Sequence, residues 1–234
     1  MTNEELRALY LKDLREGVNP MNGKKKVHRP DQWARINEEL VEGMAEAPLN
    51  WKEVLLQAWR GERDVWVWSD IHFGHHNIIR YCGRPFPNTT LMNQCLEGNY
   101  KNVVKPQDIC IFGGDIAFMP RADVEAILTR LPGKKILVVG NHDIHHGGLT
   151  RYMGFAEYHV AFVMPIEDEG FELLFTHYPL DVVPNGCINV HGHIHNHLIG
   201  GRHINMCVEH TNYAPKNIKD IITYGKALYE KFDL

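Results

Sequence analysis

The first sixty residues place their apolar side chains at the spacing of amphipathic helices. Three helices are expected there, at residues 2–17, from about 31 to 44, and from 50 to about 60. The first should begin at Thr2, because Thr2 and Glu5 form a capping box, and should stop at Gly17. Residues 18–30 contain proline, glycine and three lysines and are expected to form a loop. The expected apolar faces carry three tryptophans that should lie in the core: Trp33, Trp51 and Trp59.

From Asp64 onward, short apolar runs alternate with helical patterns. Strands are expected at residues 65–68, 109–112, 135–139, 160–164, 173–176, 188–190 and 204–208. Helices are expected at residues 91–103, 122–131 and 217–231. Strands that alternate with helices predict an α/β fold whose functional site lies where the strands end.

Polar clusters follow most of these strands. The first three strands run into SDIH, GGD and GNHD, and two later strands run into THYP and HGHIH. The glycines allow the backbone to turn sharply and bring the side chains close together. In an extended chain, residues two apart point the same way, so Asp70 and His72 are expected to converge on one point.

Carboxylates and imidazoles together suit borderline divalent metals such as zinc, manganese or iron, whereas calcium prefers oxygen ligands alone. The candidate ligands are Asp70, His72, Asp115, Asn141, His177, His193 and His195. This set is too large for one tetrahedral zinc ion. It fits two metal ions that share a bridging carboxylate.

The ordered motifs DxH, GGD, GNHD, HxP and GHxH resemble those of the calcineurin-like metallophosphoesterase superfamily. The string SDIHFGHHNIIRYCGRPF resembles in particular its small bacterial and phage members. The resemblance implies an αββα fold, a β-sandwich flanked by helices, over residues 62–234. Residues 1–61 would then form a helical N-terminal extension, which departs from the family's minimal pattern. It could be a lid, a contact in a homo-oligomer or a partner-binding element.

The resemblance also implies a role for each motif residue. One metal would be held by Asp70, His72 and His195. The other would be held by Asn141, His177 and His193, with Asp115 as the bridge. The leaving oxygen would receive a proton from His142, whose imidazole Asp143 would hold in place.

The implied reaction is hydrolysis of phosphate mono- or diesters, as a phosphodiesterase or phosphatase, by a hydroxide that bridges two divalent metals. Manganese is the expected metal, with iron, zinc and nickel as alternatives. A small nucleotide-like ester is the expected substrate, because the short segments between motifs leave little room to dock a protein. Three further side chains could contact the substrate: His76, Arg80 and Arg84. Either arginine could clamp a phosphate or form an ion pair of the protein's own.

The balance of charge weighs on the choice of substrate. Lys and Arg number 25 against 29 Asp and Glu, a net charge of −4, which argues against a protein that coats nucleic acid. A nuclease stays as an alternative, because bound metals and Lys24–Lys25–Lys26 could offset this charge. A protein phosphatase is the other alternative within the enzyme class. The rival from another class is a non-catalytic metal-binding module that recruits a partner.

The sequence also bears on the cellular compartment. No apolar run approaches the roughly 18–20 residues of a membrane span, and the charged N-terminus does not resemble a secretory signal. The five cysteines are widely spaced and are expected to be reduced thiols. The expected location is the cytoplasm of a bacterium or of a phage-infected host.

Overall fold

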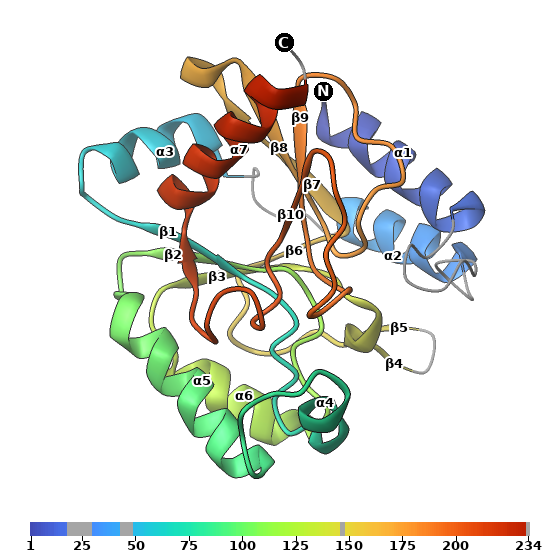
Figure 1. Cartoon of the computed structure of the whole chain (residues 1–234). Helices are drawn as coiled ribbons and strands as arrows, with labels where there is room; N and C mark the ends of the chain where they lie inside the picture. Colours follow the sequence, from blue (N-terminus) through green and yellow to red (C-terminus); the bar gives the residue numbers. More distant parts are fainter. Residues whose placement is uncertain (18–29, 43–48, 146–147, 233–234) are drawn as a thin grey trace.

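The computed structural model describes residues 1–17, 30–42, 49–145 and 148–232. Two β-sheets face each other and helices cover their outer sides (Figure 1). The first sheet has the strand order β11-β1-β2-β3-β6. Its strands are β1 (Val65–Trp68), β2 (Ile109–Phe112), β3 (Lys134–Val138), β6 (Glu157–His159) and β11 (Lys216–Asn217). All but β11 run parallel, so the carboxyl ends of β1, β2 and β3 meet at one edge.

The second sheet has the order β10-β9-β8-β7. Its strands are β7 (Ala161–Ile166), β8 (Phe171–Thr176), β9 (Cys187–His191) and β10 (His203–Asn205). The last three run parallel, and β7 pairs antiparallel with β8. A separate small ribbon joins β4 (Ile144–His145) and β5 (Gly148–Leu149). Short 3₁₀ turns lie at Asn141–Asp143 and Glu167–Glu169.

Alternation along the strands divides their side chains between the layers. In β7, Phe162 and Met164 point into the core between the sheets, whereas Val163 packs on the outer side. Helices α3 (Trp51–Trp59) and α7 (Ile218–Phe232) complete the inner core. The indole of Trp51 stacks on Phe162, with ring centroids 5.2 Å apart.

Helices cover both outer faces, as the αββα prediction requires. The first sheet is covered by α5 (Thr89–Val103) and α6 (Arg121–Arg130), with α4 (His76–Tyr81) beside them. The second sheet is covered by α1 (Asn3–Glu16) and α2 (Pro30–Glu42). The buried side chains of α1 are Leu6, Tyr10 and Leu14. The N-terminal helices therefore supply one of the helical layers.

The expected helix signals hold at two N-termini. The hydroxyl of Thr2 accepts from the Glu5 N–H at 3.1 Å, and the Glu5 carboxylate accepts from the Thr2 N–H at 2.7 Å. At α3 only the first of these two bonds forms, since the Asn50 side chain accepts from the Glu53 N–H at 3.3 Å. The prediction for Trp59 is wrong, because its ring is 55% exposed at the end of α3, where the Lys219 ammonium lies over it at 5.5 Å. The triple lysine and the expected end of the second helix, at residue 44, lie outside the described residues.

Four strands of the described chain were not expected: β4, β5, β6 and β11. All four are too short to show an alternating pattern, and each is fixed by pairing with a neighbouring strand instead. Strand β11 extends the first sheet beyond β1 and leads directly into α7.

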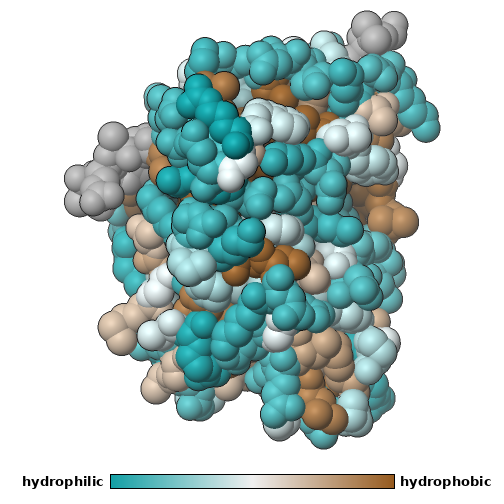
Figure 2. All heavy atoms as spheres, turned by 90° about the vertical axis from the view of Figure 1, so that its left-hand side faces the viewer, coloured by the Kyte–Doolittle hydropathy of each residue, from teal (hydrophilic) through white to brown (hydrophobic). Residues whose placement is uncertain are grey.

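The side of the molecule on which α3 lies is mostly hydrophilic, with apolar atoms in small separate groups (Figure 2). Amphipathic helices that turn their apolar stripes inward produce such a surface. None of the described helices combines the length and the apolar character needed to cross a membrane.

Substitution of Leu14 tests whether α1 belongs to the same cooperative unit as the sheets. Leu14 is fully buried, so Leu14→Ala should lower the free energy of unfolding by about 2–5 kcal/mol. Val41→Ala, at a helix position that is 45% exposed, should change it by less than about 0.5 kcal/mol. Denaturant titrations followed by far-UV circular dichroism and by tryptophan fluorescence should give one coincident transition. An early transition that reports only the loss of helix would contradict the shared core.

Candidate metal centre

The polar motifs meet where the parallel strands of both sheets end. Five of the seven candidate ligands have a left-handed backbone: Asp70 (φ 57°), His72 (φ 53°), Asp115 (φ 56°), His193 (φ 69°) and His195 (φ 47°). Residues other than glycine seldom adopt this conformation, and strain of this kind gathers at functional sites. The chain therefore makes a sharp turn at the end of three different strands, β1, β2 and β9.

These turns correct one expectation about local geometry. Asp70 and His72 do converge, but they are not alternate residues of an extended strand, because β1 has ended at Trp68 and both residues are left-handed. Backbone bonds from the loop after β2 hold this turn. The Asp70 N–H donates to the backbone carbonyl of Gly114 at 3.0 Å, and the His72 N–H donates to the backbone carbonyl of Asp115 at 3.1 Å.

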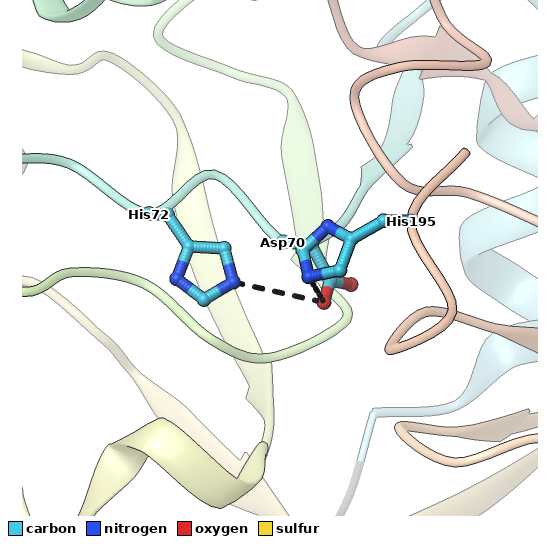
Figure 3. Close-up of side chains that lie close together, drawn as sticks. All are labelled: Asp70, His72 and His195. Carbon is cyan, nitrogen blue, oxygen red and sulfur yellow. Dashed lines mark ion pairs between the residues drawn. The ribbon is translucent and has the colours of Figure 1, made fainter. Parts of the chain in front are cut away.

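The first cluster consists of Asp70, His72 and His195. Both imidazoles point toward the same carboxylate (Figure 3). The Oδ1 atom of Asp70 lies 4.0 Å from His72 Nε2 and 3.9 Å from His195 Nε2. In the described part of the chain, Asp70 Oδ1 and His72 Nε2 are buried without a hydrogen-bond partner. Buried polar atoms without partners are costly. A cation among these atoms would satisfy them.

The second oxygen of Asp70 is used differently. Its Oδ2 accepts from Ser69 Oγ at 2.5 Å, from the His193 N–H at 2.9 Å and from Cys207 Sγ at 3.3 Å. These donors fix the plane of the carboxylate and leave Oδ1 aimed into the cluster. Ser69 and Cys207 are therefore supporting residues. Ser69 begins the SDIH cluster but was given no role there, and Cys207 stands in no motif.

Asp115 joins the first cluster to a second one. Its Oδ2 lies 3.6 Å from His72 Nε2 and 3.5 Å from His177 Nε2. Its Oδ1 accepts from the His142 N–H at 2.8 Å. One carboxylate thus faces imidazoles of both clusters, which is the arrangement that a bridging ligand requires.

The second cluster consists of Asp115, His177 and His193, with Asn141 beside it. The Nδ1 atom of His177 is 2.8 Å from the Gly113 carbonyl oxygen, which accepts its proton. This contact leaves Nε2 as the ligand atom, 3.1 Å from Asn141 Oδ1. Nitrogen and oxygen donors dominate both clusters, a set that suits manganese, iron or zinc.

The electrostatics of the centre favour a cation. Burial lowers the pKa of His72 and of His193 well below the usual imidazole value, so both are in the neutral form that binds metals. Burial also acts to lower the pKa of His177, but the Asp115 carboxylate raises it to about 9. Although burial opposes it, the same contact keeps the pKa of Asp115 well below its usual range.

Arg84 supports the backbone of the first cluster, and its buried guanidinium is bound by other groups of the protein. Its side chain is buried, and its guanidinium donates to the carbonyls of Asp70 at 2.7 Å and Ile71 at 2.8 Å. The Glu209 carboxylate accepts from Arg84 Nε at 2.9 Å and lies 3.4 Å from His195 Nδ1. Arg84 therefore forms an ion pair of the protein's own, the other reading that the sequence allowed. Glu209 stands in no motif, and only folding reveals its contact with His195.

Asp143 also differs from the role that the resemblance implies. Its carboxylate accepts backbone N–H groups of Asp115 at 2.9 Å, Ile116 at 3.0 Å and Gly140 at 2.8 Å. Both of its oxygens are thus occupied in tying the loop after β2 to the loop after β3. Its effect on His142 is exerted through the backbone and not through the imidazole.

The other two candidate substrate contacts, His76 and Arg80, are exposed on α4. Among the described contacts, neither makes a hydrogen bond or ion pair with a candidate metal ligand. The structure brings the seven candidate ligands and His142 together and leaves these two at the surface.

The N-terminal helices reach the back of the second cluster. The Tyr10 hydroxyl, on α1, accepts from the Tyr178 N–H at 3.0 Å. The ring of Tyr178 lies 4.0 Å from that of His193, and Trp33 of α2 packs edge-on against Tyr178 at 6.1 Å. The first two helices therefore support the segment that carries His177, which does not fit the alternative of a lid.

Substitution of the shared carboxylate tests the bridge. Asp115→Asn keeps the shape of the side chain but removes the charge between the two clusters, so metal content should fall at both positions. Metal analysis after gel filtration in manganese measures the stoichiometry. Two ions retained per chain at wild-type affinity would contradict the bridging role.

Gly192 offers a second test, because a Cβ there would overlap Asp70 Oδ2 and Ser69 Oγ. Gly192→Ala should displace the Asp70 carboxylate and weaken metal binding by about 10- to 100-fold, the effect typical of losing a ligand's supporting contacts. Gly98→Ala is the control, because it has open space in α5 and should raise stability by about 0.5–1 kcal/mol. Equal metal affinity for the two variants would count against the assignment of Asp70.

Comparison with known proteins agrees with this geometry. The family model described as calcineurin-like phosphoesterase matches residues 63–224. An uncharacterized protein of Methanocaldococcus jannaschii is 34% identical over 173 residues, which is 68% of this chain and 90% of that protein. A crystal structure of a protein of unknown function from Aquifex aeolicus has a TM-score of 0.56 and 27% identity, and covers 69% of this chain and 99% of its own. The chain therefore belongs to the calcineurin-like phosphoesterase family.

Proposed function

We propose that this protein hydrolyses phosphate mono- or diesters of small, nucleotide-like molecules with the help of two divalent metal ions, most simply manganese. The observation that carries the proposal is the Asp115 carboxylate, whose Oδ2 lies between His72 and His177 at 3.6 and 3.5 Å. Two ligand clusters that share one carboxylate are the protein part of a dinuclear hydrolytic centre.

The bound metals would supply positive charge that neutralises the phosphate and makes water a better nucleophile at neutral pH. The chain's own contribution is to hold the ligands still. Groups outside the clusters fix two of the ligands: Ser69 Oγ and Cys207 Sγ hold Asp70 Oδ2, and the Gly113 carbonyl holds His177 Nδ1. The atoms that face the site therefore need not reorganise during the reaction.

His142 is the proposed general acid. Its backbone N–H is anchored on Asp115 Oδ1 at 2.8 Å, and its ring centroid lies 5.4 Å from that of His72. The side chain is only partly buried, so it lies at the rim and can meet a substrate from the solvent side. From there its imidazole can donate a proton to the oxygen that leaves phosphorus.

Hydrolysis of p-nitrophenyl phosphate and bis-p-nitrophenyl phosphate tests the activity. Turnover should require added manganese, stop with chelator and return when metal is restored. A panel of nucleotides and cyclic nucleotides then locates the preferred ester. Metal binding without turnover of any of these esters would favour the non-catalytic module.

Replacement of His142 tests the acid. His142→Ala should retain metal binding and lose about 10²–10⁴-fold in kcat for alkyl esters, whose leaving oxygen needs a proton. The loss should be much smaller for p-nitrophenyl esters, whose leaving group is stable as an anion. His145→Ala, an exposed histidine on β4, is the matched control. The same loss for good and poor leaving groups would contradict a proton donor.

A further inference from the structure

An exposed phenylalanine stands beside the proposed general acid. Phe118 lies three residues after Asp115 and is 52% exposed. Its ring centroid is 5.5 Å from that of His142, with the ring planes at 72°. The residues before it, Ile116 and Ala117, are buried. Packing of the core therefore does not explain why an apolar ring is presented at the edge of a polar metal centre.

The backbone that carries Phe118 is firmly held. The Phe118 N–H donates to the Phe73 carbonyl at 2.8 Å, and the Phe73 N–H donates to the Ile116 carbonyl at 2.9 Å. These bonds join the loop after β2 to the loop after β1 in a short parallel bridge. Phe118 is thus placed by the same backbone that positions Asp115 and His72.

One neighbour fixes the orientation of the ring. The His75 imidazole stacks on Phe118, with centroids 4.6 Å apart and planes at 20°. His75 is itself placed by the turn after β1, where its N–H donates to the His72 carbonyl at 3.0 Å. The two rings form an aromatic pair, Phe118–His75, at the edge of the centre next to His142. Phe118 nevertheless stays exposed beside its stacking partner.

We propose that Phe118 is a specificity residue that binds an aromatic or heteroaromatic ring in the leaving group of the substrate. The inference rests on the proposed function, because the side of the site that His142 occupies is the side from which the leaving oxygen departs. An open phenyl ring attracts another ring by offset or edge-to-face contact in addition to burial of apolar area. An alkyl leaving group would gain less from the same surface.

Binding of two phosphonates to the manganese-loaded protein tests the inference without turnover. Phenylphosphonate and methylphosphonate share the group that would meet the metals and differ in the ring. Phenylphosphonate should bind about 3- to 10-fold more tightly by calorimetry. Phe118→Ala should abolish this preference and leave the affinity for methylphosphonate unchanged, whereas Phe118→Tyr should keep it.

Tyr224→Ala is the matched control, since it removes an exposed ring from α7 (Tyr224 is 55% exposed) and should leave the preference intact. Equal binding of the two phosphonates to the wild type, or a preference that survives in Phe118→Ala, would overturn the inference. Equal weakening of both ligands in Phe118→Ala would overturn it as well, because Phe118 would then act only by supporting its neighbours.

Kinetics separate this inference from the proposed function. With phenyl phosphate and trifluoroethyl phosphate as substrates, Phe118→Ala should raise KM about 3- to 10-fold for the phenyl ester alone, with kcat nearly unchanged. Metal-dependent hydrolysis of both esters with equal losses in the variant would refute the role of Phe118 and leave the hydrolase intact. Failure of the wild type to hydrolyse any ester would refute the proposed function and this inference with it.

Discussion

The site is organised around one buried carboxylate. Asp115 lies between the imidazoles of His72 and His177, and its second oxygen holds the backbone of His142. A buried anion is tolerated only where opposite charge or hydrogen-bond donors compensate the loss of water. Here the His177 imidazole and the His142 N–H provide that compensation, and a pair of divalent cations would provide more. The carboxylate therefore fixes the relative position of both clusters and of the proposed acid.

The turns around Asp115 show how the fold meets this demand. Left-handed residues follow the ends of β1, β2 and β9, and each costs conformational energy. Hydrogen bonds from outside the ligand set compensate this cost. Asp143 ties two of the loops together, and Arg84 donates to the carbonyls of Asp70 and Ile71 in the turn after β1. Supporting residues of this kind hold the turns that carry the ligands.

The N-terminal helices are part of this support. They cover the second sheet with a layer of buried side chains, and Tyr10 binds the backbone of the segment that carries His177. The matched relatives cover about two thirds of the chain, and the family model begins at residue 63. In this chain the segment before residue 63 supplies a helical layer that contacts the segment behind the second ligand cluster.

Local signals in the sequence predict most of the helices and strands and the types of ligand. The capping box at Thr2, the apolar runs of β1, β2 and β3, and the polar motifs behind them are local signals, since each depends on neighbours a few residues away. Contacts between distant segments leave no local signal and follow only from folding. Examples are the approach of Glu209 to His195 and of Phe118 to His142. The burial of Arg84 and the exposure of Trp59 were decided in the same way, because burial depends on which elements pack together.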